Sequence, residues 1–348
     1  MLGFDKKAAR AVWTAALVVL LLCLIYLIRS TLFIFILALL FAYLLYPLVN
    51  LIDRSLPGRG TRTAALAIAY ILFVGLFAFL STEIGSRVIQ EANALVRKFP
   101  DFVAQWNQPA PGENVLNWIK KEVGGEISEW SEHLVSTIPQ AGAKVIAFAS
   151  ELIFIVVIPI LGFFFLKDGG NIHDHILELV DDGPRRHFLE GILADTHLLL
   201  AHYMRALLGL SLTVFTVYVV FFMIAGVPYA LLLAALGAML EFIPMIGPAT
   251  ACVVILLITA ITHGPVLALV IFLIVFRIVQ DYVVSPHLMG RGVELHPLLV
   301  IFGVFAGGQV AGIAGSFLSV PIMAFGRVIY VRLHRTRLES RRLKELHR

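Results

Sequence analysis

The chain of 348 residues is 59% hydrophobic and only 14% charged, with a mean hydropathy of +0.91. A soluble core could not cover that much apolar surface, so the composition predicts a polytopic membrane protein and excludes an ordinary soluble domain. The net charge of +4 comes mainly from basic residues near the two ends of the chain. This distribution is typical of membrane orientation and argues against nucleic-acid binding.

Apolar runs long enough to cross about 30 Å of hydrocarbon recur along the chain. They cover 11–28, 31–49, 63–82, 145–166, 206–225 and 264–284. The first run follows Lys6, Lys7 and Arg10 but lacks a small-x-small cleavage site, so we interpret it as an anchor rather than a secretory signal. The run over 145–166 carries one acid, Glu151, which is either a proton site or a side chain that reaches outward to water.

Lysine and arginine residues near the ends of these runs predict the orientation in the membrane. They gather in the N-terminal segment, in the 50–62 loop and in the tail from Arg327 onward. Because such residues favour the cytoplasmic side, both termini are expected there, with 83–143 outside and 167–205 inside.

Three segments in these water-side regions have helical periodicity. Apolar residues recur at helical spacing in 84–106, 116–138 and 171–205, and the last of these segments is interrupted at Asp181-Asp-Gly-Pro184. Each segment predicts an amphipathic helix. The outer helices either lie on the membrane and pack on each other, or they make contacts between subunits.

Two longer apolar stretches, 229–262 and 295–330, are broken by turn-forming residues. The first is interrupted by Glu241-Phe-Ile-Pro-Met-Ile-Gly-Pro248, and the second by a tract of small residues from Gly307 to Pro321. In lipid, backbone without helical hydrogen bonds must be buried or line a wet cavity, so paired breaks indicate a substrate site. Each stretch either crosses once or re-enters as a helical hairpin. We favour hairpins, which make 206–262 and 264–330 an inverted repeat.

Polar residues within these stretches are the candidate site. Glu241 lies between apolar neighbours just before a break that contains Pro244, Gly247 and Pro248, and it either binds substrate or a coupling ion or forms a structural ion pair. Arg277 and Asp281, at i and i+4, pair with each other on one helix face, and that pair is either structural or a gate.

The second break carries small residues at helix-packing spacing. Gly303-x-x-x-Gly307 and Gly308-x-x-x-Gly312 predict close approach of helix backbones. Gln309 and Ser316 lie in the same tract, where they and exposed carbonyls could bind a hydroxylated solute or a cation.

Enzymatic and metal chemistries have weak support in the sequence. His173 and His175 diverge on a helix and have no third ligand at a useful spacing. Neither a nucleophile elbow nor a phosphate-cradling Walker loop is present. We therefore expect a chain that is not an enzyme and that uses no metal or cofactor.

A set of short motifs resembles the autoinducer-2 exporter family of bacterial membrane proteins over nearly the whole chain. The motifs are Lys167-Asp-Gly, Tyr203-Met-Arg205, Gly226-Val-Pro228, Ile243-Pro-Met-Ile-Gly-Pro248, Leu295-His-Pro-Leu298, Gly307-Gly308 and Gly312. After Arg205 this chain has Ala206-Leu207, where the family usually has Gly-Gln. The resemblance implies transport of small polar solutes, while some similar proteins are described as sodium/proton antiporters.

Together these observations predict an all-α membrane protein with about eight membrane segments, of which 229–262 and 295–330 are broken or re-entrant, plus amphipathic helices outside the bilayer. The expected regions are three N-terminal spans (1–82), an extracytoplasmic region (83–143), a fourth span with a cytoplasmic segment (144–205), a transport core (206–330) and a basic cytoplasmic tail (331–348).

The predicted function is a secondary transporter in the bacterial cytoplasmic membrane that exports a small polar solute similar to autoinducer-2. Its expected partners are the lipid bilayer, that solute or Na⁺/H⁺, and further copies of the chain in a homo-oligomer. The site residues are Glu241, Pro244, Gly247, Pro248, Arg277, Asp281, Gly307, Gly308, Gln309 and Gly312, with Glu151 as a possible proton site. The alternatives are a Na⁺/H⁺ antiporter and a non-transporting membrane scaffold.

Overall fold

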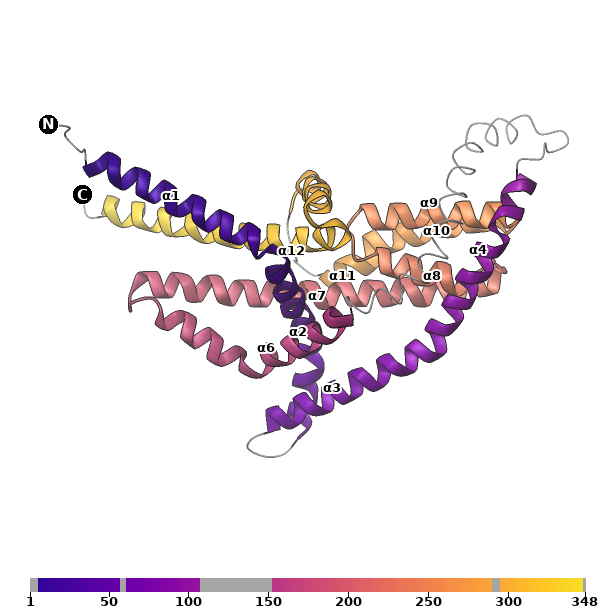
Figure 1. The fold of residues 1–348 in the computed structure, drawn as a ribbon, viewed down its shortest axis with the longest axis horizontal. Helices are drawn as coiled ribbons and strands as arrows, with labels where there is room; N and C mark the ends of the chain where they lie inside the picture. The colour runs from indigo at the N-terminus through magenta and orange to yellow at the C-terminus, as the bar shows by residue number, and fades with distance from the viewer. Residues whose placement is uncertain (1–5, 57–60, 107–151, 290–294, 347–348) are drawn as a thin grey trace.

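The computed structural model describes residues 6–56, 61–106, 152–289 and 295–346, and the regular elements in these ranges are all helical (Figure 1). Residues 6–106 contain α1 (Lys6–Leu27), α2 (Arg29–Ser55), α3 (Thr61–Leu80), the π-helical turn η1 (Ser81–Gly85) and α4 (Ser86–Trp106). Residues 152–346 contain α6 (Leu152–Glu178), α7 (Pro184–Ala225), α8 (Ala230–Leu240), α9 (Ile246–Ile261), α10 (Val266–Val279), the π-helical turn η3 (Gln280–Val284), α11 (Ser285–Met289) and α12 (Pro297–Leu346).

Helix length and composition confirm an all-α membrane protein. Within the described ranges, five helical stretches are long and apolar enough to cross a membrane: Arg29–Ser55, Arg62–Asp101, Pro184–Ala225, Val266–Leu288 and Pro297–Thr336. Shorter apolar helices cover Val12–Leu27, Ala230–Leu240 and Ile246–Ile261. Large apolar side chains face outward along α1 and α3, an arrangement that suits a lipid environment and not water.

The predicted amphipathic segments have different outcomes. The segment 84–106 is helical as expected, and it continues from α3 through η1 into α4 without a loop. Asp181-Asp-Gly-Pro184 separates α6 from α7, which confirms the predicted interruption. The segment 116–138 and the candidate Glu151 lie outside the described residues.

Helix α2 holds the N-terminal helices together and joins them to α7. Ala65, Leu66 and Ala69 on α3 are fully buried in a cluster with α2 and α6, where the two small alanines let the helices approach closely. The Tyr70 hydroxyl donates a hydrogen bond to the Pro159 carbonyl at 2.9 Å, which fixes α3 against α6. The other face of α2 packs on α7 through a second apolar cluster.

The first broken segment forms a helical hairpin. Gly226, with a left-handed φ of 69°, ends α7, and α8 then runs back along it (Figure 1). The chain reverses again after Glu241, and α9 packs against α8. A side chain at Gly264, beyond the end of α9, would lie 2.9 Å from Pro228 at the start of α8, so the two ends of the hairpin are adjacent. Because α8 has only 11 residues, it covers about 16 Å and is too short to span a bilayer.

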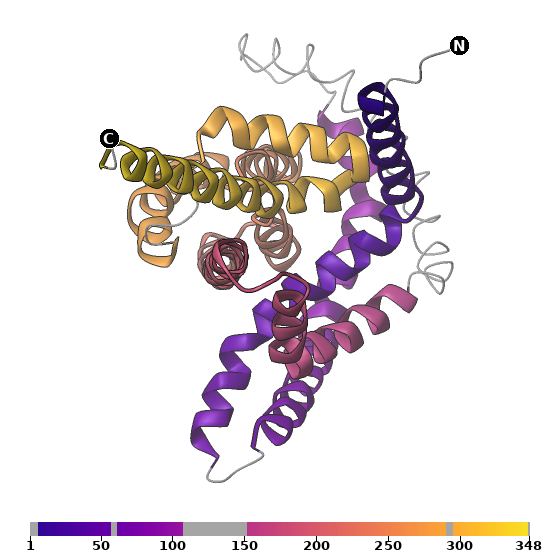
Figure 2. The ribbon, with the colours of Figure 1, turned by 90° about the vertical axis from the view of Figure 1, so that its left-hand side faces the viewer.

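The second broken segment is also a hairpin. Helix α12 changes direction at Ala311 and Gly312, and Gly312 has φ 62° and ψ −148°, a conformation that glycine tolerates and other residues do not. The two halves run side by side (Figure 2), and the Ser316 hydroxyl donates a hydrogen bond to the Val304 carbonyl at 3.0 Å. A side chain at Gly307 would collide with the backbone of Gly315, which confirms close backbone approach in this tract.

The core lies where α7, the first hairpin and α10 meet. Its buried members are Val214, Tyr218, Phe222, Val227, Leu233, Ala234, Ala251, Ile255, Leu269, Leu273 and Phe276. Phe221 and Phe272 stack with ring centroids 3.7 Å apart, and Tyr218 packs edge-on against Phe272 and Phe276. This packing holds the hairpin against α7 and α10 and so determines where its tip lies.

Candidate functional site

A cavity of about 740 Å³ opens beside the tip of the first hairpin. Its wall is formed by α7, by the break that contains Glu241, Pro244 and Pro248, by Arg277 of α10, by Ser285 of α11, and by Leu295 together with α12. The irregular backbone between α8 and α9 therefore lines a cavity. The volume is within the range of sites for small ligands.

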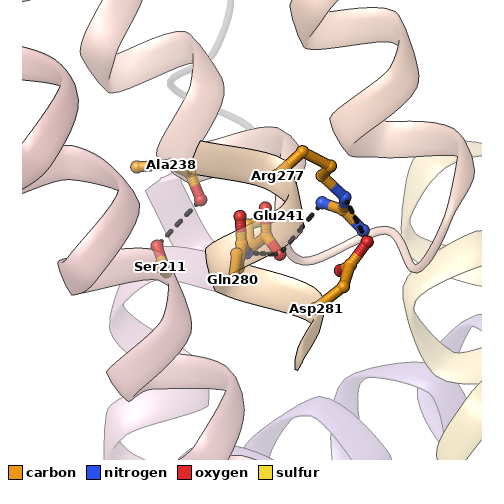
Figure 3. A network of polar contacts seen from close by, with 6 residues as sticks. All are labelled: Ser211, Ala238, Glu241, Arg277, Gln280 and Asp281. Carbon is orange, nitrogen blue, oxygen red and sulfur yellow. Dashed lines mark hydrogen bonds and ion pairs between the residues drawn. The ribbon is translucent and has the colours of Figure 1, made fainter. Parts of the chain in front are cut away.

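Glu241 is the buried acid of this cavity. Its side chain is 9% exposed, and Gln280 Nε2 donates a hydrogen bond to Glu241 Oε1 at 2.6 Å (Figure 3). Arg277 Nη1 lies 4.0 Å from the same oxygen. Glu241 follows the C-terminus of α8, where the helix dipole disfavours an anion, so the amide and the guanidinium provide the compensation that a buried carboxylate needs.

Arg277 connects two carboxylates. Its Nε donates a hydrogen bond to Asp281 Oδ2 at 3.0 Å, so the predicted i, i+4 pair is present. The same guanidinium faces Glu241 from the other helix, so the pair and the buried acid form one network (Figure 3). Arg277 and Asp281 are about one third and one half exposed, so this end of the network is less enclosed than Glu241.

Gln280 also belongs to this network, although it is not among the site residues that the sequence predicted. Its side chain is 2% exposed, and it is the first residue of η3, where α10 changes from α to π geometry. Such π turns are frequent at functional sites. An uncharged amide beside a charged pair gave little signal in the sequence, since its partner lies 39 residues away on another helix.

The local sequence explains the sharp turn after Glu241. Met245 has a positive φ of 64°, and the N–H of Ile246 donates to the Pro244 carbonyl at 2.7 Å. A side chain at Gly247 would collide with the Leu240 carbonyl, so glycine is required for α9 to start this close to α8. The Ala238 carbonyl at the end of α8 accepts a hydrogen bond from Ser211 Oγ at 2.8 Å, which satisfies a group that the break leaves without a helical partner.

The far end of the cavity is more strongly charged than the sequence predicted. Asp195 and His202 of α7 face it together with Arg327 and Arg335 of α12. Arg332 Nε donates to Asp195 Oδ2 at 2.6 Å and ties the two helices together. On α7 the lining residues Asp195, Leu198, Leu199 and His202 recur at helical spacing, so the periodicity of 171–205 was the available signal for this wall.

The glycine tract of the second break does not line the cavity. Gly307 contacts Gly315 inside the second hairpin, Gly308 faces the Ser316 hydroxyl, and Gln309 is exposed. Gly312 has no atom within 4 Å of the position a side chain would take, so it forms the turn and takes no part in close packing. The two broken segments meet instead at Phe242 and Phe317, whose ring centroids are 6.0 Å apart.

No group of three or more His, Cys, Asp or Glu side chains within the described ranges is arranged to hold a metal ion. His173 and His175 are part of α6 and bond locally, His173 to Asp174 and His175 to the Asn171 carbonyl.

An all-helical membrane protein with two broken helices and, at one break, a largely apolar cavity that contains several charged groups has the construction of a multi-pass transport protein. Comparison with known families agrees, because the family described as AI-2E family transporter matches residues 15–335. The chain belongs to that family.

Relatives of similar length have related names. The chain is 26% identical to "Putative transport protein YueF" of Bacillus subtilis (strain 168), over 86% of this chain and 84% of that protein. It is 26% identical to "Putative transport protein YrrI" of the same organism, over 90% of each chain. "Putative transport protein MT0215" of Mycobacterium tuberculosis is 27% identical, over 83% of this chain and 79% of that protein.

Proposed function

We propose that the chain is a secondary transporter that exports a small polar solute, of the autoinducer-2 type, through the cavity at the tip of the first hairpin. The observation that carries this proposal is the placement of Glu241, Pro244 and Pro248 in the wall of a cavity of about 740 Å³. Apolar side chains, two acids, three arginines and a histidine share that wall, a mixture suited to a small solute with several polar groups.

The arrangement of the hairpins supports alternating access. The first hairpin has its two ends together beside Pro228 and its tip at Glu241. The second hairpin enters and leaves near Leu295 and Arg327, close to the opposite, charged end of the cavity. We infer that both are re-entrant and inverted relative to each other, with both termini in the cytoplasm and the chain in the bacterial inner membrane.

Glu241 is the group we propose for ion coupling. Protonation of its carboxylate removes the negative charge that Arg277 faces, so that Arg277 is left with Asp281 as its anionic partner. Binding or release of one proton therefore changes the charge on the cavity wall. The same buried carboxylate supports the second candidate, a Na⁺/H⁺ antiporter, in which the solute is the ion itself.

Measurement of solute flux in liposomes distinguishes a transporter from a non-transporting scaffold. Purified wild-type protein is expected to move solute across the membrane, and a non-transporting scaffold would move none. Glu241→Gln keeps the side-chain volume and the bond to Gln280, so the variant should insert and unfold like the wild type while its flux no longer depends on a pH or sodium gradient. Unchanged gradient dependence in Glu241→Gln would assign Glu241 a structural role.

The oligomeric state and the division into regions stay predictions. We propose a homo-oligomer in which exposed apolar side chains of α3, such as Ile71 and Phe79, contact another copy of the chain instead of lipid. Mass measurement of the protein in nanodiscs tests this, and a monomeric mass would contradict it.

A further inference from the structure

The open end of the first hairpin is held by α4. Glu91 on α4 accepts a hydrogen bond from the backbone N–H of Leu232 on α8, with a distance of 2.8 Å. Leu95 and Phe99, about one and two turns further along the same face of α4, are buried against the hairpin. Figure 1 shows α4 crossing the ends of α8 and α9.

Helix α8 has an N-terminus that needs a partner. Tyr229 at the N-cap is left-handed, with φ 57°, and its side chain makes no capping hydrogen bond. The first bond within the helix runs from the Leu233 N–H to the Tyr229 carbonyl, so the preceding N–H groups have no partner inside α8. Glu91 satisfies the one at Leu232 and brings a negative charge to the positive end of the helix dipole.

The apolar contacts of α4 reach both arms of the hairpin. Leu95 and Phe99 belong to a cluster that contains Tyr229 and Leu232 from α8 and Leu257, Ile258 and Ile261 from α9. Ile261 is 1% exposed, so this cluster is closed to water. A residue pair on α4 therefore holds the two arms together at the end opposite Glu241.

We propose that Glu91 is a positioning residue that fastens the first hairpin to α4, so that hairpin and α4 move as one body. The common movement of α4 and the hairpin rests on the proposed transport function, whereas the attachment of α8 to α4 through Glu91 does not. Through α8, only 11 residues long, the position of α4 determines the position of Glu241 and hence the shape of the cavity wall.

Hydrogen exchange tests the fastening. In Glu91→Ala, the amides at the start of α8 should exchange roughly tenfold faster, since the capping acceptor is lost. Glu91→Gln keeps an acceptor oxygen and should restore most of the protection. Asp101→Ala, an exposed acid on the same helix, is the matched control and should change nothing. Equal protection in wild type and Glu91→Ala would overturn the proposal.

Cross-linking tests the common movement. Leu95→Cys with Ile261→Cys, in a background with Cys23→Ser and Cys252→Ser, places two thiols in one buried cluster. We expect reduced flux in Glu91→Ala, because the hairpin is no longer held to α4. Oxidation of the two thiols to a disulfide should leave flux at the level of the reduced protein in the Glu91 background and restore flux in Glu91→Ala. A cross-link that stops flux, reversibly when it is cleaved, would show that the hairpin leaves α4 during transport and would overturn the common movement.

These outcomes are separable from failure of the proposed function. If neither wild type nor variants move any solute, the transport proposal fails, while exchange at the start of α8 still reports whether Glu91 caps the hairpin. If wild type transports and Glu91→Ala has wild-type flux and exchange, the transport proposal stands and the fastening is wrong.

Discussion

At the scale of single residues, the site depends on a charge that is compensated from another helix. Glu241 has 9% of its side chain exposed, and its compensation comes from Gln280 and Arg277, which follow it by more than 30 residues. A buried carboxylate without such partners would be costly. The acid, the arginine and Asp281 were identifiable from charge in an apolar context, but the partner amide was not.

Loss of the amide should therefore destabilise the protein. Gln280→Leu leaves Glu241 without its close hydrogen bond, and we expect the free energy of unfolding to fall by about 2 kcal/mol. The double variant Gln280→Leu with Glu241→Met removes both polar partners and should recover most of that loss. Thermal unfolding in detergent measures both, with Gln309→Leu, an exposed amide in α12, as the control. Equal stability of Gln280→Leu and wild type would contradict the importance of this bond.

At the scale of elements, the two hairpins reverse the direction of the chain in different ways. The first turns at Met245 with the help of Pro244 and Gly247, and its two arms contribute side chains to one buried cluster. The second turns at Gly312 and brings the backbones of Gly307 and Gly315 into direct contact. The sequence located both breaks because proline, glycine and a buried acid interrupt apolar runs, but it did not tell that Gly312 makes the turn.

Glycine substitutions in α12 should consequently have opposite effects. Gly307→Ala forces the hairpin arms apart, and we expect a loss of about 1–3 kcal/mol in stability together with reduced flux. Gly326→Ala, on the returning half of the same helix, meets no atom within 4 Å and should stabilise by about 0.5–1 kcal/mol through helix propensity. Thermal unfolding and flux of the two variants are compared side by side. Wild-type behaviour of Gly307→Ala would show that the arms can separate without cost.

At the scale of the whole molecule, the proposed re-entrant hairpin predicts which residues face the same compartment. Pro228 and His263 flank the first hairpin at its open end, and Asp182 lies between α6 and α7 at the end of α7 far from that opening. In a molecule without its native cysteines, an impermeant thiol reagent applied outside should label Pro228→Cys and His263→Cys. The same reagent should label Asp182→Cys only after it is given access to the cytoplasmic side. Labelling of Pro228→Cys and His263→Cys from opposite sides would establish a single crossing and remove the inverted repeat.

The sequence by itself determined the class of this protein, its all-helical fold and the positions of the breaks. These properties depend on local composition and periodicity, which a linear sequence contains in full. Only the tertiary structure decided that Arg277 faces Glu241, that Asp195 and Arg335 share a cavity with them, and that Glu91 caps α8. Each of these contacts joins helices that are distant in the chain. Many packings bury apolar faces about equally well, so apolar pattern alone does not specify which polar groups meet.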